Sequence, residues 1–432
     1  TENKLDQNIT GYDEPITGEI TFDDVSFGYN DEETSLENIN IKIAPGQTVA
    51  IVGQTGSGKT TGRIVVSASR RTDIPAFYME DFMRNARQGF FTREQLDAVL
   101  AEDRYARVSC EVMATTGMVI VTGQITTKSY IDITAIVRET VRKVGYNDPV
   151  IGFDHNSCAV LVMLEEQSGD VSLGVDRKGA GDQGVCVGYA TDEGRSLPVD
   201  THFMPVPAFL ANGLARKLGE IRDKGRLADI YPDGKVQVSV RYRNEKPVEI
   251  TTVVLSAHHH ADADLAKLRR DLKRLVIKPF LDPTGLMTKD TQVLINPVGA
   301  FSEGGPRADA GLTGRKTGMD TYGEFSRHSG TALSGKDPLR VDRVGAYAAR
   351  YAAKNVVAAG LASECEVMLS YSIGLTQPVS LQVQTFGTSS IPESKIVDLL
   401  VQNFDFRLAG ILRQFRLRQL PVKHTGGFYQ KL

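Results

Sequence analysis

The chain has 432 residues, of which 41% are hydrophobic and 24% are charged, and this composition is typical of a folded globular protein. Its 50 basic and 53 acidic side chains leave a net charge of −3, so nothing global favours nucleic acid or a membrane surface as a partner. At this length we expect two to four domains, and no apolar run reaches the ~18 residues that a membrane-spanning helix needs.

The cysteines do not indicate a structural role in metal binding or cross-linking. The chain contains Cys110, Cys158, Cys186 and Cys365, and no two of them have the C-x-x-C spacing. Because paired spacings of this kind are the usual sign of a zinc site or a disulfide framework, neither is indicated. Residues 1–4 also lack the apolar core of a signal peptide. We therefore expect reduced cysteines in a cytoplasmic protein.

The first part of the chain contains a phosphate-binding pattern. Residues 53–60 read Gly-Gln-Thr-Gly-Ser-Gly-Lys-Thr, a complete Walker A motif that follows an apolar strand. Together with the strand-like runs before it, this motif makes residues 1–62 resemble the start of an ATP-binding-cassette domain. The Leu-Ser-Gly-Gly-Gln signature of such domains does not follow, and a P-loop without its partner sheet cannot position a metal or a water. Lys59 is either an ATP anchor or, as we favour, part of a truncated fragment left by a gene fusion.

A junction segment follows at 63–92. Within it, residues 67–80 read Ser-Ala-Ser-Arg-Arg-Thr-Asp-Ile-Pro-Ala-Phe-Tyr-Met-Glu and are similar to the opening of an uncharacterised bacterial family. We expect the N-terminal segment to be partly β and foreign to the rest of the chain.

From residue 105 onward a β-hairpin followed by a helix recurs three times. The hairpins are expected at 105–126, 235–257 and 366–386, and the helices at 131–144, 262–278 and near 393–404. Units of this kind spaced by roughly 130 residues predict three similar tandem domains of the α/β (α+β) class. The expected boundaries are 93–180, with parts of the C-terminus, then 181–300 and 301–432. The alanine-rich run 341–361 predicts a long buried helix.

Two glycine-rich runs lie far apart in the chain. The first is Gly-Ala-Gly-Asp-Gln-Gly at 179–184, and the second occupies 304–316. Glycine lets the main chain approach a charged phosphate ligand and point its N–H groups at it. Arg315 and Lys316, at the end of the second run, add cationic donors. The two runs therefore predict a binding site for a highly charged phosphate compound.

These motifs, with others in the same order, resemble the S-adenosylmethionine synthetases over about residues 93–432. The further matching blocks are 117–121, 152–154, 156–160, 320–323, 334–338, 341–343, 346–351 and 354–361. A single glycine-rich run would be weak support, whereas this many ordered blocks imply homology. The resemblance implies the three-domain α/β architecture and a homodimer or dimer of dimers with its site between subunits. It also implies ATP and L-methionine as substrates, with neither nucleic acid nor membrane as partner.

The implied reaction is an attack of the methionine sulfur on C5′ of ATP. The triphosphate leaves and is then cut to phosphate and pyrophosphate, so the protein must align the sulfur and stabilise charge on the leaving group. By resemblance, Lys235, Arg315, Lys316 and Lys336 bind the polyphosphate, and the last three are the expected catalytic cations. Each charge-assisted hydrogen bond is worth ~1.5–3 kcal/mol.

The resemblance assigns other residues to the nucleoside and methionine parts of the site. Asp182 and Asp309 are expected to contact the adenosine or methionine portion, and Phe301 to stack near the base. Asp233 belongs to the same nucleotide pocket. Gln167 matches the start of a mobile gate over the site.

Two cations are implied as cofactors. Asp342 matches a Mg²⁺ ligand and Glu111 matches a K⁺ ligand, and both cations prefer oxygen donors. The run His-His-His at 258–260 invites a metal interpretation, but we expect a polar strand end before the next helix.

The chain departs from the family pattern at two important places. No His-Pro-Asp occurs anywhere in it, although that motif supplies the family with a catalytic histidine and a magnesium carboxylate. Gln124 stands where the family has a glutamate facing methionine, and a charge at ~4 Å is worth up to ~4 kcal/mol at an effective dielectric near 20. We therefore separate family membership from turnover by this chain.

Four functional hypotheses follow. The chain is an active or weakly active synthetase, or a catalytically dead dimeric relative that still binds nucleotide. Alternatively, it is an ATP-binding-cassette component that uses Lys59, or its fused start is an assembly artefact without a biological role.

Overall fold

The computed structural model describes residues 20–28, 34–44, 76–80, 96, 98–166, 179–314 and 317–417. The chain divides into two compact units, Thr1–Thr72 and Asp73–Leu432. In the described part of the first unit, β1 (Ile20–Gly28) pairs antiparallel with β2 (Thr34–Ile43). The Walker A motif, and with it Lys59, lies outside the described residues.

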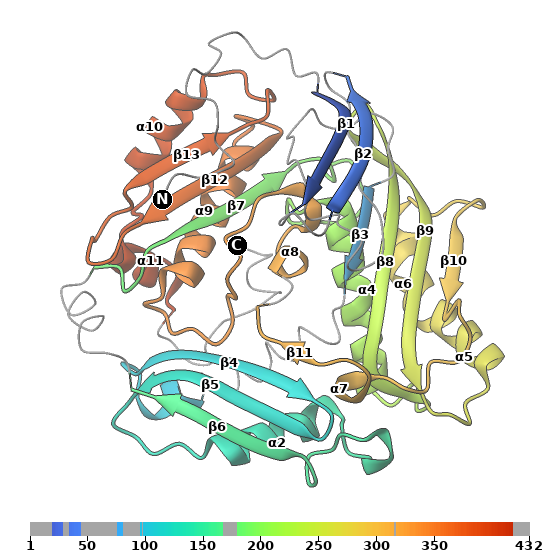
Figure 1. Ribbon diagram of the computed structural model, residues 1–432. Helices are drawn as coiled ribbons and strands as arrows, with labels where there is room; N and C mark the ends of the chain where they lie inside the picture. Colours follow the sequence, from blue (N-terminus) through green and yellow to red (C-terminus); the bar gives the residue numbers. More distant parts are fainter. Residues whose placement is uncertain are drawn as a thin grey trace. The chain divides into compact units, whose positions relative to one another are not determined.

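The second unit contains three sheets in its described residues. One of them has four strands in the order β11-β4-β5-β6 (Figure 1). Its strands are β4 (Arg107–Thr115), β5 (Met118–Thr126), β6 (Ala159–Glu165) and β11 (Gly311–Leu312). Alternate residues of β4 are buried, as the period-two pattern requires. The turn between β4 and β5 uses Gly117 at a φ of 63°, which glycine adopts without a steric penalty. The predicted hairpin at 105–126 is confirmed.

Helix α2 (Ile133–Val144) covers the buried face of this sheet and confirms the helix predicted at 131–144. It begins where the Asp132 carboxylate accepts a hydrogen bond from the Ala135 N–H at 2.9 Å, because that bond satisfies an orphan donor of the first turn. It ends at Gly145, which adopts the left-handed conformation.

A second four-stranded sheet has the order β10-β9-β8-β3. Its strands are β3 (Ala76–Glu80), β8 (Ile230–Arg243), β9 (Lys246–His259) and β10 (Gln292–Ile295). The hairpin between β8 and β9 turns at Asn244 and Glu245, whose φ angles of 49° and 60° match the twist of the strands. The second predicted hairpin, 235–257, is thus confirmed and is longer at both ends.

Helices pack on one face of this second sheet. They are α4 (Val206–Asp223), α5 (Leu265–Leu272) and α6 (Lys278–Leu281). The helix predicted at 262–278 begins later, because the Asp264 carboxylate caps α5 by accepting from the N–H groups of Ala266 and Lys267. It continues beyond Ile277 through a π-helical turn, η2 (Lys273–Ile277).

The third sheet, in the order β13-β12-β7, joins distant parts of the chain. Its strands are β7 (Gly184–Thr191), β12 (Glu364–Tyr371) and β13 (Ser380–Gln384). The hairpin predicted at 366–386 is confirmed, and α10 (Glu393–Asn403) confirms the helix near 393–404. β7 follows the first glycine-rich run directly, yet it pairs antiparallel with β12 rather than with its chain neighbours. The third sheet is therefore built from two parts of the chain, residues 184–191 and 364–384, that are separated in the chain by strands β8, β9 and β10 of the second sheet.

Helix α9 (Val341–Ala358) packs against β7 and β12 (Figure 1). It is buried over most of its length, as predicted, and it ends three residues short of the predicted 361 because Gly360 adopts a φ of 71°. A Cβ at Gly188 would lie 2.0 Å from the backbone of Ala349, so glycine is what allows this close approach. The fully buried Arg350 donates to the carbonyls of Tyr189 and His202 and so ties the helix to neighbouring chain.

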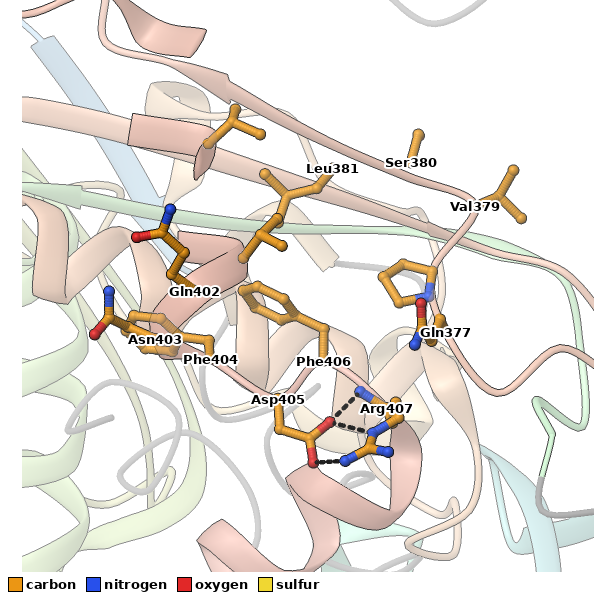
Figure 2. A pocket seen from close by; sticks show the side chains of 13 residues that line it. Gln377, Val379, Ser380, Leu381, Gln402, Asn403, Phe404, Asp405, Phe406 and Arg407 are labelled. Carbon is orange, nitrogen blue, oxygen red and sulfur yellow. Dashed lines mark hydrogen bonds and ion pairs between the residues drawn. The ribbon is translucent and has the colours of Figure 1, made fainter. Parts of the chain in front are cut away.

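The C-terminal part also contains a pocket of about 650 Å³ (Figure 2). Its walls come from β13, from the end of α10 and from residues 404–407, which precede α11 (Leu408–Phe415). Arg407 and Asp405 form a two-bond ion pair at its edge, with N···O distances of 2.7 and 2.8 Å. None of the residues assigned to the site by sequence lines this pocket. No helix in the described ranges has the length and apolar content needed to cross a membrane.

Candidate functional site

Two short stretches of the C-terminal part, residues 311–313 and 335–337, lie antiparallel to β4 and bring the C-terminal motifs to it. Gly311 pairs with Ala114 at one end, and at the other the Cys110 N–H donates to the carbonyl of Gly335 at 2.9 Å. Lys336 therefore forms an isolated bridge with Ser109. This pairing places a cation of the Ser-Gly-Lys-Asp motif two residues from Glu111 in register along the same strand.

Asp337 holds this arrangement in place, although sequence reasoning gave it no role. Its Oδ2 accepts from the Val108 N–H at 2.8 Å, and its Oδ1 accepts from the Leu339 N–H at 2.7 Å. The side chain is 2% exposed, and this burial raises the pKa of the Asp337 carboxyl against the lowering effect of the two N–H donors. Its position next to Lys336 in the sequence could have indicated this role. A residue whose side chain is bonded to a neighbouring strand also fixes the orientation of the residue beside it.

We expect Asp337→Asn to be destabilising and to loosen Lys336. The amide can accept only through its oxygen, so its NH₂ group would face one of the two backbone donors. A buried donor left without an acceptor costs about 1–3 kcal/mol. Chemical denaturation would measure this loss, and an equally stable variant would show that the clamp is energetically unimportant. Asp290→Asn, at an exposed position, is the matched control.

Lys336 and Asp342 form an ion pair at the start of α9. The Nζ of Lys336 lies 2.7 Å from Oδ2 of Asp342, and the two side chains are only 11% and 14% exposed. Because this environment contains little water, the attraction between the charges is stronger than on an open surface. The pair thus keeps a cation and a carboxylate in a defined geometry at a helix N-terminus.

The first glycine-rich run ends beside this pair. A Cβ placed on Gly184 would lie 3.2 Å from Oδ1 of Asp342, so the last glycine of that run is adjacent to the carboxylate. Asp182, two residues earlier, is exposed and accepts from the Gln183 N–H at 2.8 Å. The structure therefore brings the end of the 179–184 run to Lys336 and Asp342. Arg315, Lys316 and Gln167 lie outside the described residues.

Glu111 and Gln124 line one shallow cavity of about 690 Å³ on the outer face of the first sheet. Ser109, the bridge partner of Lys336, lines it as well, so the cavity adjoins the Lys336 segment. Strands β4 and β5 approach each other closely at Gly123. A Cβ at this position would lie 2.0 Å from the carbonyl oxygen of Ser109, and the φ of 135° also favours glycine.

The chain between β10 and α7 (Gly305–Ala308) carries Phe301, and α7 begins at the residue that Asp233 binds. Asp233 is 1% exposed, and its Oδ2 accepts from the Gly305 N–H at 2.8 Å. The Phe301 ring lies 5.3 Å from the His258 ring, centroid to centroid. Lys235 lies on β8 opposite Ser256.

The segment 305–312 links these two groups of residues. It leaves Asp233 at Gly305 and reaches β4 at Gly311, and the exposed Asp309 lies between these anchors. Among the described residues no three or more His, Cys, Asp or Glu side chains form a ready metal site. The site therefore offers individual carboxylates, two anchored loops and an oriented lysine.

Comparison with known proteins gives a consistent result. Three family models match in order: the S-adenosylmethionine synthetase N-terminal domain at 92–169, the central domain at 177–301 and the C-terminal domain at 303–431. One similar relative is the S-adenosylmethionine synthase of Desulforudis audaxviator (strain MP104C). It is 51% identical over 347 residues, which cover 77% of this chain and 86% of the relative.

Proposed function

The chain belongs to the S-adenosylmethionine synthetase family, and we propose that it joins ATP and L-methionine into S-adenosylmethionine, releasing phosphate and pyrophosphate. The observation that carries the proposal for the site is the meeting of Gly184, Lys336 and Asp342, which come from separate motifs. Lys336 is a cation of the kind that binds a polyphosphate, and Asp342 is a carboxylate of the kind that binds a hard metal cation.

Lys336 is proposed to stabilise the leaving triphosphate. Negative charge develops on that group as the sulfur attacks C5′, and a preoriented cation in a site with little water stabilises it without reorganising. The clamp of Asp337 on β4 supplies this orientation. Phe301, Asp233 and Asp309 are assigned to the nucleoside and methionine, with Arg315, Lys316, Lys235 and Asp182 completing the site.

The carboxylates fit the two implied cations by donor chemistry. Magnesium is commonly held by one or two carboxylates together with substrate phosphates, so Asp342 alone is a sufficient protein ligand for our assignment. Glu111, with Ser109 and Thr122 beside it, offers oxygen donors for K⁺. When bound, Mg²⁺ supplies charge neutralisation of the polyphosphate.

We further propose a homodimer formed through the outer face of the first sheet. This face carries Glu111 and Gln124, and β6 exposes the apolar side chains of Leu161 and Met163 on it at 47% and 64%. Exposed apolar groups around a polar cavity are typical of a face covered by a partner. In such a dimer, Asp182 of one subunit would face Lys316 of the other.

The N-terminal segment is proposed to take no part in the reaction. Residues 1–62 are interpreted as a truncated ATP-binding-cassette fragment, and about 63–90 as a piece of an uncharacterised bacterial family. Any ATPase activity should accordingly be insensitive to Lys59→Ala.

The direct test is to incubate the purified full chain with ATP, L-methionine, Mg²⁺ and K⁺ and to quantify S-adenosylmethionine by mass spectrometry. We expect slow product formation, because the His-Pro-Asp motif is absent. Gln124→Glu should lower the KM for methionine, since it restores a carboxylate opposite the substrate ammonium, whereas Gln402→Glu in the separate pocket should not. Nucleotide binding without any product would favour the catalytically dead relative instead.

A further inference from the structure

We propose that His258 and His259 are positioning residues that hold residues 301–305 in their nucleotide-binding shape, and that they do so only as neutral imidazoles. The inference rests on the proposed function in one respect, the assignment of Phe301 to the nucleotide. It gives a role to the histidine run that the chemistry above does not use.

His259 forms hydrogen bonds with both the backbone N–H and the backbone carbonyl of Phe301. The His259 N–H donates to the Phe301 carbonyl at 3.0 Å, and the His259 Nε2 lies 2.9 Å from the Phe301 nitrogen. The other ring nitrogen, Nδ1, is 2.8 Å from the His260 carbonyl oxygen. Since a carbonyl only accepts and the Phe301 N–H only donates, Nδ1 must carry the proton and Nε2 must be bare.

His258 is held in the opposite tautomer. Its Nε2 lies 3.1 Å from the Ser302 carbonyl oxygen, so this nitrogen carries the proton. His258 is 1% exposed, and its buried Nδ1 has no hydrogen-bond partner among the residues that the structure describes. A Cβ on Gly304 would lie 2.7 Å from the ring, so the loop backbone packs directly on the imidazole. Two adjacent histidines thus fix consecutive residues of one loop.

A second proton on either ring would disturb this arrangement. On His259 it would set an Nε2–H against the Phe301 N–H, turning a hydrogen bond into a repulsion. On His258 it would place a charge in the core, and burial accordingly lowers the pKa of His258 below its ordinary 6.5. The charged and titratable groups around the pair are Tyr231, Asp233 and His260, with Asp148 and Asp262 next to Tyr231.

The direction of the pH effect follows from linkage. A histidine with a lowered native pKa binds fewer protons in the native state than in the unfolded state, so its contribution to loop stability falls as the pH drops through about 6.5. The attraction of Asp233 for an added proton opposes this loss without exceeding the effect of burial. We therefore expect the 301–305 loop to loosen in mild acid, and Phe301 with it.

The first test needs no nucleotide. In the full chain labelled with ¹⁵N-histidine, the imidazole shifts should report an Nδ1–H tautomer for His259 and an Nε2–H tautomer for His258. Amide hydrogen exchange in a peptide covering 299–305, corrected for intrinsic rate, should accelerate below pH 6.5. Identical tautomers, or protection unchanged down to pH 5.5, would overturn the inference whatever the protein binds.

The second test measures the affinity for the magnesium complex of a non-hydrolysable ATP analogue between pH 7.5 and 5.5. The wild-type Kd should rise by up to about tenfold, the limit for one titrating histidine, which is about 1.4 kcal/mol. His258→Gln keeps a donor for the Ser302 carbonyl but cannot be protonated, so its Kd should change several-fold less. His202→Asn is the control, because asparagine tolerates the φ of 55° at position 202 and this residue lies outside the proposed nucleotide site.

The two tests separate the two ideas. If His258→Gln and the wild type share the same pH dependence, the positioning role is wrong even though nucleotide binds. If nucleotide does not bind at any pH while the tautomers and the exchange behave as expected, the proposed function fails and the loop-holding role survives.

Discussion

Lys336→Ala should weaken ATP binding by about 10- to 150-fold, the equivalent of one charge-assisted hydrogen bond of ~1.5–3 kcal/mol. Lys336 is the expected polyphosphate cation that the described structure places beside Asp342, at 2.7 Å and largely out of solvent. Isothermal titration with ATP and Mg²⁺ would give the Kd directly. Product formation should fall at least as much, because the same charge is proposed to stabilise the leaving triphosphate.

The variant also leaves the Asp342 carboxylate without its partner, so stability must be measured in parallel. Removing one member of a buried pair typically costs several kcal/mol. Lys336→Arg, which keeps the charge, should remain as stable as the wild type and lose less affinity. Lys289→Ala, at an exposed position outside the site, should change nothing. A folded Lys336→Ala protein with unchanged affinity for ATP would remove Lys336 from the site.

Gly188→Ala should unfold the third sheet with its helix α9, or destabilise the protein by more than about 3 kcal/mol, because overpacking against backbone cannot relax by a side-chain rotation. The added Cβ would lie 2.0 Å from both the carbonyl carbon of Ala349 and the nitrogen of Arg350. Helix α9 would have to move away from β7, and it carries Asp342 at its first turn. Circular dichroism during thermal unfolding would measure the loss, together with the yield of folded protein.

Gly219→Ala provides the matched control within the same protein. Gly219 lies in α4, a Cβ there meets nothing within 4 Å, and its φ is not in the left-handed region. Alanine at such a helical position should stabilise by about 0.4–1 kcal/mol by restricting the unfolded chain. Equal effects of the two substitutions would mean that the close approach of α9 to β7 has no energetic importance.

Local patterns predicted the elements well. The hairpins turn at Gly117 and at Asn244 and Glu245, where the residue types match the backbone conformation that the turn needs. The helices were found by their apolar spacing, and their ends differ where a cap decides the boundary, as Asp264 does for α5. Both signals act over a few residues, so a single sequence contains them in full.

Long-range pairings were not predictable in the same way. The sequence of residues 184–191 does not predict that β7 pairs with β12. Nor does the local sequence predict that the Asp337 carboxylate accepts a hydrogen bond from the Val108 N–H. Such contacts depend on which of many compatible strand edges and buried donors the whole chain satisfies together. The histidine run shows the same limit, because its residue types allowed either a metal site or a strand end.

By itself, the sequence determined the set of ordered motifs, and their resemblance to one family implied the chemistry, because residue types and their spacing are present in the chain before it folds. It also determined the repeating hairpin and helix, through periodicity and turn residues. Only the tertiary structure decided that Asp337, next to Lys336, is bonded to β4 and that Lys336 is paired with Asp342. It also decided that His259 is bonded to Phe301 and His258 to Ser302. The physical reason is that hydrogen-bond direction, burial and protonation are properties of neighbours in space, and those neighbours are far apart in the chain.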